Sequence, residues 1–135
     1  MSQEEQHYPL TKPFWDGARA GSLMIPHCEA CQRWQWPVKY RCTHCGGALR
    51  WKAATGRGTL LSWSEVLRAP RPELKALVPY VVAFVALEEG VRIMTRLAPS
   101  GHLGLAVGQP VWCSFETIQA EPGATELPVF SIVEG

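Results

Sequence analysis

The sequence predicts a mainly β protein in which a short N-terminal helix and a cysteine-rich ribbon precede a small antiparallel β domain. Two observations carry most of this prediction. Two Cys-x-x-Cys pairs lie ten residues apart between residues 28 and 45, and five strand-like segments follow between residues 58 and 134. In addition, no pattern of normal helix length occurs after residue 55, so the second half of the chain is expected to be all β.

The composition is that of a folded chain with no strong preference for a polyanion. Of its 135 residues, 47% are hydrophobic and 19% are charged, and the net charge is +1. A near-neutral chain is a poor nucleic-acid ligand, because affinity grows with the number of phosphates neutralised. The longest apolar run, 77–87, is shorter than the ~20 residues needed to span a bilayer, and the N-terminus lacks the features of a signal peptide. We therefore expect a cytoplasmic protein.

Residues 11–23 predict a short helix of about two turns. Thr11 is a possible N-cap, Pro13 lies in the first turn, and Gly21 is a stop signal. Phe14 and Trp15 lie within this segment, and a helix this short is marginal on its own. Its aromatic side chains are therefore expected to pack on the rest of the chain or on a partner protein.

The two cysteine pairs predict a metal site. Cys28, Cys31, Cys42 and Cys45 have the spacing C-x2-C-x10-C-x2-C, and two such knuckles direct four sulfurs to one point, the arrangement that zinc prefers. In a reducing compartment this pattern indicates metal before disulfide. Zinc is the expected ion, with iron as the main competitor. His27 and His44 lie beside the ligands but are not needed to complete the site.

Four thiolates also indicate that the metal is structural. A catalytic zinc keeps an open coordination position, whereas four sulfurs close the shell. Structural zinc contributes roughly 10–16 kcal/mol to folding, which matches the whole stability of a typical domain at about 5–15 kcal/mol. The metal would thus replace the hydrophobic core that so short a ribbon cannot build.

The strand-like segments after the ribbon predict a small antiparallel β domain. They alternate apolar and polar residues or are apolar throughout, and Gly108 to Pro110 and Pro128 introduce the last two; the segments are 58–68, 80–90, 91–97, 111–118 and 129–134. Closure into a five-stranded barrel, the OB-fold, would remove exposed edges. We divide the chain into an N-terminal segment (1–24), a zinc ribbon (25–52) and an OB-fold domain (56–135).

Two groups of residues are candidates for binding. Trp34 and Trp36 alternate along the ribbon loop, so they either pack the ribbon against the next domain or contact a partner. The proline-rich loop 68–79 is either solvated or a binding element, and its basic residues are Arg68, Arg71 and Lys75. Cys113 lies alone in a strand and is expected to be a core thiol.

The motifs taken together resemble a known family. They are 13-PFW-15, the four-cysteine ribbon, 56-GRGTLLSW-63, 68-RAP-70, 79-PYVVAFVALEEGVRIMTRL-97 and 108-GQPV-111. This order is similar to that of the zinc-ribbon/OB-fold acyl-CoA-associated proteins, the domain of unknown function thirty-five, over residues 13–118. The resemblance implies a rubredoxin-like ribbon and an OB barrel. It also implies a non-catalytic subunit, in a hetero-oligomer, that supports a thiolase-like, aldolase or hydratase enzyme acting on coenzyme A thioesters.

The resemblance suggests what the candidate binding residues would contact. Arg68, Arg71 and Lys75 would bind coenzyme A phosphates through charge-assisted hydrogen bonds, and four aromatic side chains would contact the partner: Phe14, Trp15, Trp34 and Trp36. No catalytic residue is expected, because the sequence offers no activated nucleophile, paired carboxylates or phosphate-binding glycine loop.

Two other functions compete with this interpretation. Ribbons and OB barrels both bind single-stranded nucleic acid through stacked aromatics in a basic groove, although the net charge argues against it. A single Cys-x-x-Cys pair is also the motif of thiol-disulfide oxidoreductases, but there it opens a helix, and no helical pattern follows either pair here.

Overall fold

A computed structural model describes residues 9–68, 78–98, 104–120 and 123–133. A 3-10 turn, η1 (Pro9–Thr11), leads into the helix α2 (Lys12–Arg19), and two strands form the ribbon, β1 (Met24–Cys28) and β2 (Leu49–Ala53). Five strands follow: β3 (Arg57–Val66), β4 (Tyr80–Leu87), β5 (Arg92–Leu97), β6 (Pro110–Ala120) and β7 (Gly123–Ile132). Within these described residues, no helix is long and apolar enough to cross a membrane.

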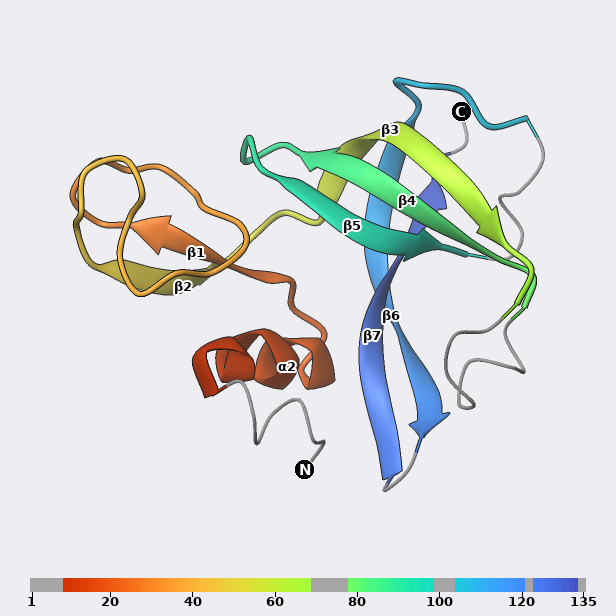
Figure 1. The fold of residues 1–135 in the computed structure, drawn as a ribbon, viewed down its shortest axis with the longest axis horizontal. Helices are drawn as coiled ribbons and strands as arrows, with labels where there is room; N and C mark the ends of the chain where they lie inside the picture. The colour runs from red at the N-terminus through yellow and green to blue at the C-terminus, as the bar shows by residue number, and fades with distance from the viewer. Residues whose placement is uncertain (1–8, 69–77, 99–103, 121–122, 134–135) are drawn as a thin grey trace.

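The five later strands close into a barrel with the order β3-β4-β5-β7-β6 (Figure 1). Neighbouring strands pair antiparallel, except that β5 meets β7 in parallel at Leu97 and Phe130. β1 and β2 form a separate two-stranded antiparallel sheet beside the barrel. The prediction of a mainly β chain with one short helix and a five-stranded closed barrel is confirmed.

The helix differs from the prediction at one end. It ends where expected, because Gly21 takes the positive φ of +80° that a residue just past a helix end often adopts. Thr11 occupies the N-cap position, but its side chain makes no capping hydrogen bond. A capping side chain needs an extended backbone, and the preceding 3-10 turn leaves Thr11 at φ −97° and ψ 1°.

The last two strands are longer than predicted and form an extended hairpin. β6 and β7 stay in register from Val111 and Ile132 out to Ala120 and Gly123, so β7 begins well before Pro128. The prediction that Pro128 introduces this strand is wrong. The proline is tolerated inside β7 because the ladder to β5 has a partner only at Phe130, which leaves that side of β7 largely unpaired near residue 128.

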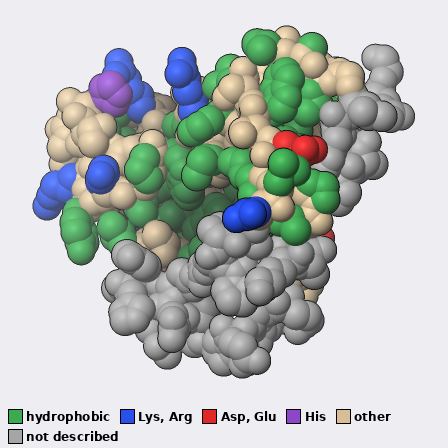
Figure 2. All heavy atoms as spheres, turned by 45° about the vertical axis from the view of Figure 1, so that its right-hand side comes forward, with side chains coloured by type: hydrophobic (Ala, Val, Ile, Leu, Met, Phe, Trp, Pro, Cys, Tyr) green, Lys and Arg blue, Asp and Glu red, His purple; other side chains and the backbone are tan. Residues whose placement is uncertain are grey.

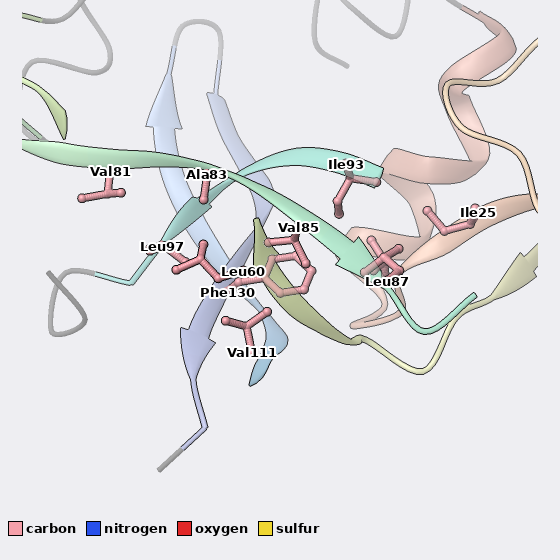
Figure 3. Packing of buried hydrophobic residues seen from close by; sticks show 11 residues of the cluster. Ile25, Leu60, Val81, Ala83, Val85, Leu87, Ile93, Leu97, Val111 and Phe130 are labelled. Carbon is pink, nitrogen blue, oxygen red and sulfur yellow. The ribbon is translucent and has the colours of Figure 1, made fainter. Parts of the chain in front are cut away.

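The core fills the barrel and continues into the ribbon. Alternate residues of β4 point inward, where they meet buried side chains from the other four strands, Leu60, Leu97, Val111 and Phe130 (Figure 3). Leu23 and Ile25 belong to the same buried cluster, and Ile25 lies beside Leu87 and Ile93 in Figure 3. The ribbon and barrel therefore share one hydrophobic core, although their sheets are separate.

Gly58 allows β3 to approach β4 closely. A Cβ atom at this position would lie 2.5 Å from the backbone oxygen of Ala86 and 2.7 Å from Cγ1 of Val85. Because the first of these atoms belongs to a hydrogen-bonded strand, it cannot move aside without disturbing the ladder.

We expect Gly58→Ala to lower the free energy of unfolding by about 1–3 kcal/mol, the range for overpacked sites. Urea denaturation followed by circular dichroism measures it. The exposed Ser64→Ala on the same strand is the control and should change stability by less than about 0.5 kcal/mol. Equal stability of the two variants would contradict this packing.

Candidate metal centre and the surface beside it

The two cysteine pairs fold into knuckles with matching backbone hydrogen bonds. In the first, the amide of Gln32 donates to the carbonyl oxygen of Cys28 at 2.9 Å, and in the second, that of Gly46 donates to Cys42 at 2.9 Å. The leading cysteine of each knuckle also donates its amide to a carbonyl five residues later, at 2.7 Å for Cys28 and 2.9 Å for Cys42. The same set of backbone hydrogen bonds therefore shapes both knuckles.

The four sulfur atoms converge at the separations that zinc requires. They all lie within 4.8 Å of one another, with 3.5 Å between those of Cys28 and Cys45 and 3.7 Å between those of Cys31 and Cys42. A tetrahedral ion with Zn–S bonds of about 2.3 Å holds its sulfurs about 3.8 Å apart. The donor set and spacing therefore fit a structural zinc, and four thiolates complete its coordination.

Gly47 makes room for these sulfurs. A Cβ atom there would lie 3.1 Å from the sulfur of Cys28 and 3.2 Å from that of Cys45. Its φ is not positive, whereas Gly46 takes φ +74°. No pattern in the sequence indicates that the second glycine keeps space free beside the metal.

Backbone amides prepare the thiols for a cation. The N–H of Cys45 lowers the pKa of the Cys42 thiol to about 6, and the N–H of Cys31, 3.5 Å from the sulfur of Cys28, lowers the pKa of Cys28. Partial burial raises the pKa of Cys31 to about 12. Because zinc binds thiolates, its binding removes the protons that remain.

Gln35 ties the two knuckles together, which the sequence did not predict. Its side-chain oxygen accepts a hydrogen bond from the backbone N–H of Thr43 at 2.9 Å, and its backbone N–H donates to the carbonyl oxygen of Pro26 at 2.9 Å. One buried residue thus connects β1, through its backbone, to the loop that carries the second knuckle, through its side chain. No motif marks such a residue, because its role depends on contacts between distant segments.

The two histidines next to the ligands lie outside the metal cluster. The buried His27 packs edge-on against Trp34, with 5.0 Å between the ring centres. The exposed His44 has its Nδ1 atom 2.7 Å from a guanidinium nitrogen of Arg33. Among the described residues, the cluster of close ligand atoms contains the four cysteines alone.

The predicted partner-contact aromatics separate into two places. Phe14 contacts both Trp15 and Trp36, at 5.1 Å and 5.2 Å between ring centres, so the helix and ribbon loop meet through these rings. Trp34 instead lies against His27, and the ammonium of Lys52 sits 5.5 Å from the centre of its ring. Three of the four aromatics are therefore gathered beside the helix.

These three rings line a hollow on the outside of the barrel. We call it the helix groove; it has a volume of about 470 Å³ and is lined by Thr11, Phe14, Trp15, Trp36, Tyr80, Met94, Thr95, Arg96, Ile118, Leu127 and Pro128. Its walls come from the helix, the ribbon loop and strands β4 to β7. The sequence suggested the aromatics as contact residues but gave no sign that barrel residues complete the site.

The predicted coenzyme A site lies mostly beyond the described part of the chain. Arg68 is exposed two residues after the end of β3, and Arg71 and Lys75 lie outside the described residues. Cys113 packs partly buried against the core, and its thiol is 3.4 Å from the backbone oxygen of Ser114. Burial raises the pKa of Cys113 to about 12, so this thiol stays protonated at neutral pH.

We expect the purified chain to hold one zinc ion, and Cys42→Ser to lose it together with the ribbon structure, because three thiolates leave the shell open. Acidification should also release zinc, since protons compete for the sulfurs. Metal analysis by mass spectrometry measures both effects. Cys113→Ser is the matched control and should retain zinc. Full zinc content in Cys42→Ser would contradict the assignment.

The raised pKa of Cys113 predicts a slow thiol and an alkaline loss of stability. The folded state holds this proton more tightly than the unfolded state, in which cysteine has a pKa of about 8.5. The contribution of this thiol to the free energy of unfolding is therefore fully present below that pH, and it is lost as the pH rises towards about 12. Alkylation at pH 8 followed by mass spectrometry should label Cys113 much faster in denaturant than in the native protein; equal rates would refute burial of this thiol.

Known proteins share both halves of this architecture. The rubredoxin-like zinc ribbon domain of ChsH2 matches residues 15–50, and the C-terminal OB-fold domain of ChsH2 matches residues 51–116. A DUF35 domain-containing scaffold protein of Methanothermobacter thermautotrophicus is 31% identical over 96 residues, which cover 70% of this chain and 71% of the relative.

Two further relatives are named for acyl-CoA hydration and aldol chemistry. A probable enoyl-CoA hydratase alpha subunit of Thermomonospora curvata is 35% identical over 87% of this chain, which spans only 36% of that relative's length. The solved structure of an Ltp2-ChsH2(DUF35) aldolase has a chain that is 30% identical, with a TM-score of 0.74 and 90% and 93% of the two chains covered. Over its ribbon and its barrel alike, the chain belongs to the ChsH2/DUF35 family of zinc-ribbon and OB-fold proteins.

Proposed function

We propose that this chain is a zinc-stabilised, non-catalytic accessory subunit that scaffolds an enzyme acting on acyl-CoA thioesters. The observation that carries the proposal is the closed tetrathiolate. Four sulfurs within 4.8 Å fill the coordination shell of zinc, so the metal supports the fold and leaves no position for a substrate.

The reactive groups in the described part of the chain support the same conclusion. The thiol outside the metal cluster, Cys113, is held protonated by burial, and the ion pair beside the helix groove joins Arg96 to Glu116. A nucleophile needs a lowered pKa or an adjacent base. The Cys113 thiol has a raised pKa instead, and the carboxylate of Glu116 is engaged by Arg96. The groove therefore has the lining of a contact surface rather than that of an active site.

The names of the relatives support an acyl-CoA setting. They include an enoyl-CoA hydratase subunit, a scaffold protein and a chain of an aldolase complex. We infer a hetero-oligomer in the cytoplasm with a catalytic subunit of the aldolase, hydratase or thiolase-like type. Of these classes, the first two are named among the relatives, and the thiolase-like class rests on the sequence resemblance alone.

We also propose that this chain binds coenzyme A directly. Arg68, Arg71 and Lys75 would supply charge-assisted hydrogen bonds to its phosphates. In the reconstituted complex, combined Arg68→Ala and Arg71→Ala substitutions should raise the Michaelis constant for the thioester with little change in kcat. An unchanged Michaelis constant would remove these residues from the substrate site.

The competing functions receive less support. A thiol-disulfide oxidoreductase uses one free pair of cysteines, whereas here both pairs converge on one point. Nucleic-acid binding has no support from the names of the relatives reported above. Steep salt-dependent retention on single-stranded DNA would favour it.

The scaffold role is tested by purifying the tagged full-length chain from its source organism. A catalytic subunit with its own reactive residues should co-elute in a fixed ratio, and the thioester activity should reside in that subunit or the complex. The isolated chain should be inactive on the same thioester. Turnover by the chain alone, or its elution without any such subunit, would contradict the proposed function.

A further inference from the structure

The near-neutral net charge conceals a basic ribbon. Residues 25–52 contain five lysine and arginine residues against one glutamate, whereas the remaining chain has eight basic residues against eleven acidic ones. The five basic side chains are all exposed, namely those of Arg33, Lys39, Arg41, Arg50 and Lys52. A bound zinc with four thiolates contributes two negative charges, which still leaves the ribbon positive.

The helix groove adjoins this basic ribbon. Trp36 lines the groove, and the same ribbon loop continues from it to the exposed Lys39 and Arg41. Figure 2 shows hydrophobic side chains gathered near the middle of the visible face, with Lys and Arg side chains towards the ribbon. The guanidinium of Arg96 in the groove wall is paired with Glu116, so its charge is already balanced within the protein.

The apolar surface extends beyond the groove along two strands. Phe84 on β4 lies directly opposite Met94 on β5, and their side chains are 46% and 66% exposed. Met94 also lines the groove, so the pair and the groove are continuous. A contiguous apolar surface with a charged border is the composition of a protein–protein interface.

We propose that the helix groove and the Phe84–Met94 pair form a socket for the catalytic subunit, which inserts apolar side chains bordered by aspartate and glutamate. The inference rests on the proposed function and adds the site and chemistry of docking. The basic ribbon supplies the charge complementarity that orients such a partner.

The same charge argues against a second copy of this chain. A two-fold dimer buries the same patch on both subunits, so a dimer through the socket would bring two basic ribbons towards one another. Like charges facing across an interface are strongly unfavourable. A partner with acidic residues at the border of the contact removes this repulsion.

The socket is tested by photocrosslinking in the source organism, with Met94 replaced by p-benzoyl-phenylalanine in the full-length chain. The crosslink should join this position to one peptide of the catalytic subunit, rich in apolar residues and flanked by Asp or Glu. Val107 is the matched control, because its side chain is 70% exposed and does not line the groove. The same replacement there should give no such product.

Binding measurements on the purified complex provide the second arm. Met94→Asp should weaken association about tenfold or more, as for a central interface residue, whereas Met94→Leu and Val107→Asp should bind normally. Combined Lys39→Glu and Arg41→Glu substitutions should slow association and reduce its dependence on salt, while Arg57→Glu, outside the ribbon, should not. Thermal melting confirms that each variant is folded.

Several results would overturn the socket. They are a crosslink from position 94 to a second copy of this chain, equal crosslinking from position 107, or no crosslink. Normal association of Met94→Asp with the copurified subunit would also refute it while leaving the scaffold function intact.

A crosslink to an apolar, acid-bordered peptide of an unrelated protein would keep the docking chemistry and refute the acyl-CoA setting. Quenching of Trp15 and Trp36 fluorescence by decanoyl-CoA, abolished in Met94→Asp, would assign the groove to a small ligand.

Discussion

Coordination of one zinc ion by four thiolates holds together the part of this protein that has almost no core of its own. Between β1 and β2, most side chains are at least partly exposed, and the turns depend on hydrogen bonds to the cysteines and on Gln35. Zinc coordination contributes a free energy comparable with that of a whole domain. Removing it would leave a loop of about twenty residues with few buried contacts, so the position of Trp36 and of the basic side chains depends on the metal.

The ribbon transmits this order to the barrel through a shared core. Leu23 and Ile25 are buried together with residues of β4 and β5, and the helix packs against β1 and β7. These contacts bring Phe14 and Trp36 over the outer face of the barrel, where the helix groove forms. The groove thus requires three elements that come from separate parts of the chain, and the proposed scaffold role depends on the rigidity with which they are held.

Local sequence signals predicted the parts of the structure that local physics determines. The cysteine spacing specifies the metal site, because each knuckle is a turn of a few residues, and apolar alternation indicated the barrel strands. The start of β7 was missed because Pro128 looks like a strand boundary, although its side of the strand lacks a full ladder. The groove, Gln35 and the spacing role of Gly47 depend on contacts between residues far apart in the chain. The basic residues of the ribbon can be counted in the sequence, but the net charge of the whole chain hides them because acidic residues elsewhere balance them.

Amide hydrogen exchange with and without zinc tests the central claim most directly. If the tetrathiolate maintains the ribbon, chelation should remove protection from the amides of Cys28, Gln35 and Cys42 while most barrel amides, such as those of β4, stay protected. The environment of Trp36 should change at the same time, because the groove loses its ribbon wall. Unchanged protection across the ribbon after complete removal of the metal would show that zinc does not hold this scaffold together.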